Sequence, residues 1–215
     1  MHFENYIDQT LLKPTATEKD IKQLCADALN YNFYGICING CYLSLAKDLL
    51  KDSKVKLVSV VGFPLGSMST KAKVNEAMDY MGQGANELDM VLNIGWLRSA
   101  DYSAVQEEIR QVKEVVGNNV LKVILETCYL TDAEIITACK LAVSAKADFV
   151  KTSTGFGPRG ASFEDVVLMK KAVGNKIKIK ASGGIKDALM AQKYIDLGVA
   201  RIGTSSGVAI VTKHN

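Results

Sequence analysis

The sequence has few residues of the kinds that build metal or redox sites. Its two histidines, His2 and His214, lie near the two ends of the 215-residue chain, so a histidine-based zinc or iron site inside the fold is not expected. The five cysteines form no C-x-x-C pair and are odd in number. This pattern favours reduced thiols in a cytoplasmic protein over a disulfide framework.

No long apolar run and no excess of one charge is present either. The 26 basic and 23 acidic residues are spread along the chain and leave a net charge of +3, which gives little electrostatic basis for binding nucleic acid or a membrane surface. No apolar run approaches the roughly 18 residues of a membrane span, and the first ten residues, MHFENYIDQT, lack the apolar core of a signal peptide. We therefore expect a cytoplasmic protein, with a small anionic ligand compatible with its charge.

Short runs rich in valine, isoleucine and leucine alternate with longer amphipathic segments, a pattern typical of βα units around a parallel sheet. Strands are predicted at residues 6–11, 35–39, 56–62, 86–93, 120–127, 147–152, 176–182 and 200–204. Helices are predicted at residues 17–31, 41–51, 69–83, 102–116, 132–145, 163–173 and 186–197. Together they predict a single-domain (β/α)8 TIM barrel over residues 1–215. The alternative is a doubly wound open sheet, but no G-x-G-x-x-G follows any predicted strand.

Several predicted strands contain charged residues, although a strand between barrel core and helices should be apolar on both faces. These residues are Glu87, Asp89, Lys122, Glu126, Lys151, Lys178 and Lys180. Most lie toward the C-terminal ends of their strands, where the active site of a barrel forms. Lys178 is expected to begin its strand and to reach solvent at the opposite end. The alternative is an ion-pair network without chemistry, and for Lys122 and Glu126 that alternative is as well supported as a catalytic role.

Lys151 and Lys180 are the predicted catalytic lysines. Two neighbouring ammonium groups repel, so stability alone gives no reason to place them together. A lysine attacks a carbonyl only when uncharged, and a nearby cation with partial burial brings a lysine pKa from about 10.4 toward about 7 to 8. Lys180 is therefore expected to favour the uncharged form of Lys151. Asp89 is the predicted proton-transfer group, with Glu87 as a second and more structural candidate.

Three glycine-bearing turns follow late strands: TSTGFG at 152–157, ASGGIK at 181–186 and GTSSG at 203–207. Glycine lets a ligand approach the backbone closely, and barrels often bind phosphate after their seventh and eighth strands. Each turn alone is more typical of an ordinary loop than of a ligand site. Together they predict a phosphate site with hydroxyl donors from Ser205 and Ser206 and a short anion-binding helix at 207–211. The expected substrate is a phosphorylated sugar-like aldehyde or ketose.

Seven ordered motifs resemble those of the deoxyribose-phosphate aldolase family over nearly the whole chain: IDQTLL, GFPLG, ELDMV, LKVILET, FVKTSTGFG, KASGGI and RIGTSSG. The resemblance implies reversible cleavage of 2-deoxy-D-ribose 5-phosphate to D-glyceraldehyde 3-phosphate and acetaldehyde, with no metal or organic cofactor. It implies that Lys151 forms a Schiff base, that Lys180 lowers the pKa of the Lys151 amine and that Asp89 transfers protons. It also places Lys122 near the substrate hydroxyls, Thr10 and Cys37 in the pocket, and the phosphate among Gly155, Gly183, Gly184, Gly203, Ser205 and Ser206.

One departure from the family concerns the end of the chain. Members commonly end in a tyrosine that assists proton exchange, whereas this chain ends in TKHN. Either water performs that proton exchange together with Asp89 and Lys180, or residues that are not in this sequence perform it. A sugar-phosphate isomerase and a phosphosugar-binding module are the alternative functions, but an isomerase usually relies on an electrophile such as histidine, which the interior lacks. A homodimer is a further expectation.

Overall fold

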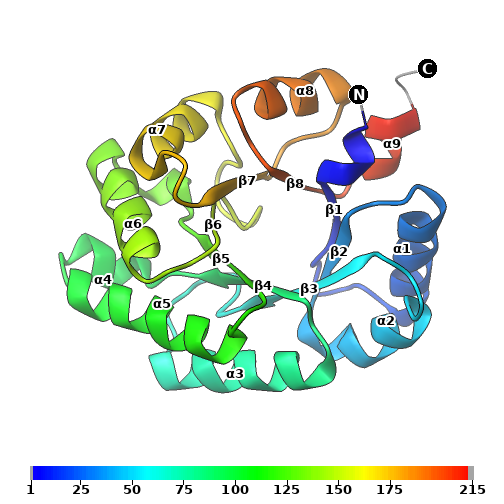
Figure 1. The fold of residues 1–215 in the computed structure, drawn as a ribbon, viewed down its shortest axis with the longest axis horizontal. Helices are drawn as coiled ribbons and strands as arrows, with labels where there is room; N and C mark the ends of the chain where they lie inside the picture. The colour runs from blue at the N-terminus through cyan, green and yellow to red at the C-terminus, as the bar shows by residue number, and fades with distance from the viewer. Residues whose placement is uncertain (1, 213–215) are drawn as a thin grey trace.

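The computed structural model describes residues 2–212, and its eight parallel strands close into a barrel (Figure 1). Neighbouring strands follow chain order, and β8 pairs with β1. The strands are β1 Ile7–Leu11, β2 Gly35–Ile38, β3 Lys56–Val61, β4 Glu87–Val91, β5 Val120–Ile124, β6 Phe149–Lys151, β7 Lys178–Ser182 and β8 Arg201–Thr204. The single α/β domain is a TIM barrel, which confirms the predicted fold and excludes the open sheet.

Helices surround the barrel, and the seven predicted ones are found within a few residues of their expected bounds (Figure 1). They are α1 Glu18–Asn30, α2 Leu43–Leu49, α3 Thr70–Gln83, α5 Tyr102–Val116, α6 Asp132–Ser144, α7 Phe163–Val173 and α8 Ala188–Asp196. The short helix expected at 207–211 is α9 Gly207–Thr212. Four short elements were not predicted: α4 Ile94–Arg98 and the 3-10 turns η1 Phe3–Tyr6, η2 Gly40–Tyr42 and η3 Thr127–Tyr129.

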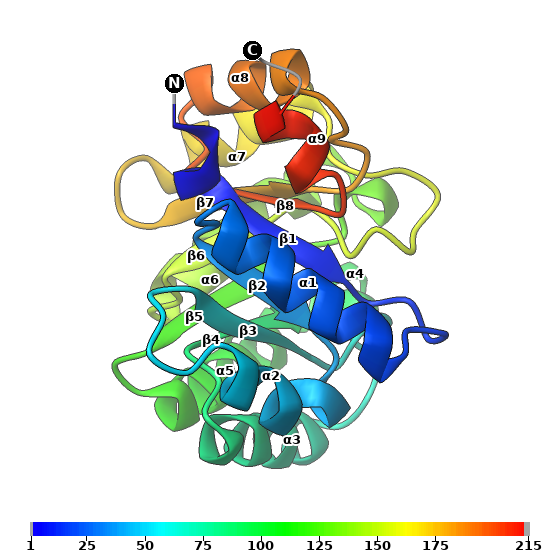
Figure 2. The same cartoon turned by 90° about the vertical axis from the view of Figure 1, so that its right-hand side faces the viewer.

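Local signals in the sequence explain where these helices begin and end. Thr17 and Thr131 form capping boxes with Asp20 and Glu134, which satisfy backbone N–H groups in the first turns of α1 and α6. Gly174 ends α7 with a positive φ of 59°, a conformation that favours glycine. The first and last elements of the chain also meet: η1 packs against α9, and the two lie side by side in both views (Figure 1 and Figure 2).

The two faces of the strands differ in chemistry. Outward-facing residues such as Ile36, Leu88 and Val150 are fully buried against the helices in one large apolar cluster. The inward faces of β1, β4, β5, β6, β7 and β8 instead carry buried charged side chains. Within residues 2–212, none of the helices has both the length and the apolar character of a membrane span.

Candidate active site

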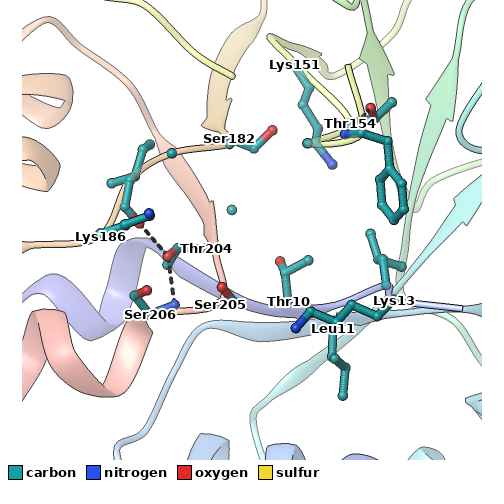
Figure 3. A pocket seen from close by; sticks show the side chains of 17 residues that line it. Thr10, Leu11, Lys13, Lys151, Thr154, Ser182, Lys186, Thr204, Ser205 and Ser206 are labelled. Atoms are coloured by element: carbon teal, nitrogen blue, oxygen red, sulfur yellow. Dashed lines mark hydrogen bonds between the residues drawn. The ribbon is translucent and has the colours of Figure 1, made fainter. Parts of the chain in front are cut away.

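A cavity of about 350 Å³ opens where the C-terminal ends of β1, β6, β7 and β8 meet their loops (Figure 3). This is the end of the barrel at which TIM-barrel enzymes carry their active sites. Eight residues singled out from the sequence line it: Thr10, Lys151, Gly155, Gly183, Gly184, Gly203, Ser205 and Ser206. Asp89, Lys122, Lys180 and Cys37 are buried and lie outside this lining.

Lys151, the last residue of β6, is the amine at the wall of the cavity. Figure 3 shows its side chain pointing into the space, toward Thr10 on the other side. Its Nζ donates a hydrogen bond of 2.8 Å to Oδ2 of Asp89. Lys151 is only 2% exposed, so the amine contacts the cavity while the rest of the side chain is packed.

Lys180 lies behind this contact, on β7 directly opposite Lys151 in the strand register. Its Nζ donates to the same Oδ2 of Asp89 at 2.8 Å and to Oδ2 of Asp8 at 2.5 Å. The two lysines therefore share one carboxylate oxygen. The proximity expected from the sequence is present, but Asp89 attracts both lysines and offsets their mutual repulsion.

The charges around Asp89 fix its ionisation. Burial by itself raises the pKa of this carboxyl, but Lys122, Lys151 and Lys180 outweigh that effect and hold the pKa well below its usual range. Burial likewise lowers the pKa of Lys180, but Asp8 and Asp89 raise it above its usual range. Near neutral pH the site therefore contains a fixed carboxylate and a fixed ammonium group.

The turns after β6 and β7 surround one side of the cavity with backbone. Gly155, Gly183 and Gly184 have φ values of 89°, 87° and 83°, which favour glycine. A Cβ on Gly183 would lie 2.8 Å from the Cα of Gly160, so a side chain there would push these turns apart. The sequence therefore needs glycine here to keep backbone at the cavity wall.

A hydroxyl links the turns after β7 and β8. The Thr204 side chain donates to the Ile185 carbonyl at 2.7 Å and accepts from the Ser206 amide at 2.9 Å (Figure 3). These bonds hold Ser205 and Ser206 beside the glycine turns. The arrangement places backbone amides and hydroxyls together, as an anion site requires.

Comparison with known proteins supports an assignment of the chain. A model of the DeoC/LacD family of aldolases matches residues 4–213. The chain belongs to this family. The deoxyribose-phosphate aldolase of Mycoplasmopsis pulmonis is 52% identical over 211 residues, which cover 98% of this chain and 96% of that protein. The deoxyribose-phosphate aldolase of a Thermoanaerobacter species is 51% identical over 218 residues, which cover 100% of this chain and 98% of that protein. The deoxyribose-phosphate aldolase of Aeropyrum pernix, described as tetrameric, superposes with a TM-score of 0.88 at 34% identity, covering 97% of this chain and 89% of that one.

Two charged residues of this DeoC/LacD family member were not singled out from the sequence. Asp8 on β1 and Arg201 on β8 are buried inside the barrel and joined by a 3.0 Å ion pair. Both lie within predicted strands, so the rule that selected the other charged residues would also have found them. Lys13 and Lys186 were missed as well: they are exposed cations that line the cavity, and Lys186 is the last residue of the predicted glycine turn at 181–186.

Lys122, Glu87 and Glu126 separate into two groups. Lys122 is fully buried, with its Nζ 2.8 Å from Asp89 and 2.5 Å from Glu87, so it belongs to an ion-pair network. Glu126 instead accepts hydrogen bonds from the backbone N–H of Thr154, at 3.1 Å, and from the Thr154 hydroxyl. Its φ of 53° is rare for a residue with a side chain. Glu126 therefore holds the loop after Lys151 in place.

Cys37 lies in a position that differs from the expectation. It faces inward on β2, but it is fully buried in a small apolar cluster with Leu12, Val58 and Val60, against which Phe63 packs. Burial raises the pKa of its thiol. Cys37 does not line the cavity, although Lys180, Asp89 and Lys151 are close enough to interact with its thiol electrostatically. The C-terminal tail, 213–215, and His214 with it, lies outside the described residues.

Proposed function

We propose that this chain is a deoxyribose-phosphate aldolase that reversibly cleaves 2-deoxy-D-ribose 5-phosphate to D-glyceraldehyde 3-phosphate and acetaldehyde. The observation that carries this proposal is the Lys151 amine at the cavity wall, bonded to a carboxylate that Lys180 also binds. The names of the full-length relatives support the same substrate. The proposed mechanism uses side chains alone, with no metal and no organic cofactor.

The first step forms a covalent bond to Lys151. Its uncharged amine attacks the aldehyde carbon of the open-chain sugar, and the resulting carbinolamine loses water to give an imine. Once protonated, the imine nitrogen accepts the electron pair that is released when the carbon–carbon bond breaks. The low exposure of Lys151 keeps bulk water away from this intermediate.

The second step moves protons. The hydroxyl at the bond to be cleaved loses its proton as that bond breaks, which releases D-glyceraldehyde 3-phosphate and leaves an enamine on Lys151. Asp89 is proposed to relay this proton through a water molecule toward the enamine carbon without staying protonated, because its lysine neighbours hold it as a carboxylate. Hydrolysis of the new imine then frees acetaldehyde. Lys180 is proposed to remain charged throughout.

The phosphate is proposed to bind the backbone amides of Gly155, Gly183, Gly184 and Gly203 together with the Ser205 and Ser206 hydroxyls. All six residues line the cavity. Lys186, beside Thr204 in Figure 3, adds a cation on the same side. Thr10, across from Lys151, is proposed for the sugar hydroxyls. Lys122, expected there from the family resemblance, is fully buried outside the cavity lining and contacts Asp89 and Glu87 instead.

Location and assembly are also proposed. Cys25, Cys37 and Cys139 are buried free thiols, which favours a reducing compartment such as the cytoplasm. A homodimer of single-domain chains remains the expected assembly, and sedimentation equilibrium tests it directly.

Reductive trapping tests the proposed chemistry. Incubation with acetaldehyde and borohydride is expected to add one ethyl group to the protein, and peptide mapping is expected to place it on Lys151. Lys186→Arg, which changes another lysine of the same cavity, is the matched control and should retain the adduct, whereas Lys151→Arg should lose it. An adduct spread over surface lysines with none on Lys151 would contradict the proposal.

A further inference from the structure

Six buried side chains inside the barrel form a closed ring in which positive and negative charges alternate. Taken in order around the ring, they are Asp89, Lys180, Asp8, Arg201, Glu87 and Lys122, and we call them the charge ring. The nitrogen-to-oxygen distances between successive members are 2.8, 2.5, 3.0, 3.0 and 2.5 Å, and Lys122 closes the ring onto Asp89 at 2.8 Å. No member of the ring depends on solvent for its counter-charge.

The charge ring is electrically balanced. It contains three carboxylates and three cations, and each member is at most 5% exposed by its side chain. Lys151 is a seventh charged group, attached to the ring only through Asp89 among the ion pairs that the described residues form. When Lys151 is protonated, the buried cluster carries one unbalanced positive charge, and when it is neutral the cluster is balanced.

Burying an unbalanced charge is costly, because little water is present to solvate it. We propose that the balance of the charge ring sets the pH range in which Lys151 is uncharged and reactive, and that Arg201 and Glu87 are positioning residues for this purpose on the far side of the ring. This inference rests on the proposed function, since it concerns the reactivity of the imine-forming amine. It differs from a direct effect of Lys180 on Lys151, because it assigns the effect to the summed charge of the ring.

The groups around the Lys151 amine come from several strands. Asp89 on β4 contacts it directly, Lys180 on β7 and Lys122 on β5 contact the same carboxylate, and the Cys37 thiol on β2 is close enough to interact electrostatically. The ion pairs of Arg201 and Glu87 are instead made with the other ring members. A charge change at Arg201 or Glu87 therefore acts on Lys151 electrostatically, by altering the net charge of the ring.

The far side of the ring is held rigidly. The guanidinium of Arg201 stacks on the Tyr34 ring with its Cζ 3.3 Å from the centroid, and the Tyr34 hydroxyl donates to Glu87 at 3.1 Å. Arg201 also binds Asp8 and Glu87 at 3.0 Å each. These contacts keep both charges at constant positions, as an electrostatic role requires.

The sign of the effect follows from the balance. Removing the charge of Arg201 leaves the ring negative, which stabilises protonated Lys151 and moves its reaction to higher pH. Removing the charge of Glu87 leaves the ring positive, which moves the reaction to lower pH. A unit charge roughly 10 Å away at an effective dielectric constant of about 20 shifts a titration by about one pH unit, so we expect shifts of that order.

The experiment measures the rate of cyanoborohydride trapping of acetaldehyde on Lys151 as a function of pH. Arg201→Met is expected to raise the midpoint of this profile by about one pH unit and Glu87→Gln to lower it by about the same amount. The double variant keeps the ring balanced and should return to the wild-type midpoint. Arg201→Lys keeps the charge and should leave the midpoint in place.

Folding is checked on each variant by thermal unfolding. If Arg201→Met does not fold, the isosteric variants Glu87→Gln and Asp8→Asn carry the test, and both should lower the midpoint. Unchanged midpoints, or shifts of one sign for variants of opposite charge, would overturn the role of the charge ring. Failure of wild-type protein to form any Lys151 adduct would instead overturn the proposed function, so the two failures are distinguishable.

Discussion

The protein contains a second buried lysine–carboxylate contact, and it differs instructively from the charge ring. Lys73 on α3 donates to Glu108 on α5 at 2.7 Å and to the Val91 carbonyl at 2.8 Å, and both side chains are fully buried. This pair lies between helices outside the barrel and does not line the cavity. It has one charge of each sign, Glu76 is a further carboxylate close enough to act on Lys73, and there is no surplus cation. Burial of paired charges therefore does not by itself identify a reactive site.

The balance between burial and charge also differs between the two regions. Burial dominates at the isolated pair, so the pKa of Glu108 is raised and that of Lys73 is lowered, despite their mutual attraction. Inside the barrel Asp8 and Asp89 each have two or more cationic neighbours, and attraction outweighs burial, so the pKa of each is lowered, that of Asp89 well below its usual range. A ring compensates for lost solvent better than a single pair does.

Removing Lys151, the surplus cation, is expected to have the largest effect. Lys151→Ala is expected to lower kcat/KM roughly 10⁴-fold or more, because the covalent step is lost. Asp89 keeps Lys122 and Lys180 as partners, so the melting temperature should remain close to that of the wild type. Steady-state kinetics and a thermal melt measure both quantities. Retained turnover would refute the assignment of Lys151.

The isolated pair should respond in the opposite way. Lys73→Met leaves Glu108 buried without its cation and is expected to lower the free energy of unfolding by about 3 to 5 kcal/mol, while kcat of the folded enzyme changes by less than about twofold. Urea unfolding and kinetics below the transition test this. The double variant Lys73→Met/Glu108→Leu should recover most of the stability. A large loss of kcat at full folding would show that the pair does affect catalysis.

Asp8 makes the stability of the barrel depend on pH in the acid range. Burial raises the pKa of Asp8, but Lys180 and Arg201 lower it overall, from 3.8 to about 2. Because the folded pKa lies below the unfolded one, Asp8 stabilises the fold above about pH 4, and this contribution of about 2 kcal/mol is lost as pH falls toward about 2. Urea unfolding at a series of pH values should show a shallower acid loss for Asp8→Asn. An identical slope would mean that Asp8 is not ion-paired in solution.

The smallest effect is expected at Lys186, because this cation of the cavity is exposed to solvent, unlike the buried cations of the charge ring. Lys186→Met should raise KM for the phosphorylated substrate about fivefold, or about 1 kcal/mol, and leave KM for unphosphorylated 2-deoxyribose unchanged. Lys193→Met, an exposed lysine on α8, is the matched control. Equal effects on both substrates would place Lys186 away from the phosphate.

Much of the site follows from strand alternation. Because side chains alternate between the faces of a strand, the sequence predicts that Lys151, Lys180 and Asp89 face inward near the same end of the barrel. The glycine turns are also predicted from the sequence, because three of them follow adjacent late strands. Glu126 was harder: its strand was predicted to run to residue 127, but β5 ends at Ile124 and the chain then turns through a positive φ.

Other features depend on distance in space rather than position in sequence. Lys180 and Asp8 are 172 residues apart, and Arg201 and Asp8 are 193 apart, so their pairing appears only when β8 closes onto β1. The burial of Cys37 likewise depends on Leu12, Val58 and Val60, which come from other segments of the chain.

The strand and helix order, the inward-facing charges, the glycine turns and the lysine at the cavity wall follow from the amino-acid sequence, because they depend on local periodicity and residue type. Which charge neutralises which depends on the folded barrel. Coulomb attraction depends on separations of a few ångströms, and barrel closure sets these between strands that are far apart along the chain. The balance of the charge ring, and Lys151 as its surplus cation, therefore belong to the folded barrel.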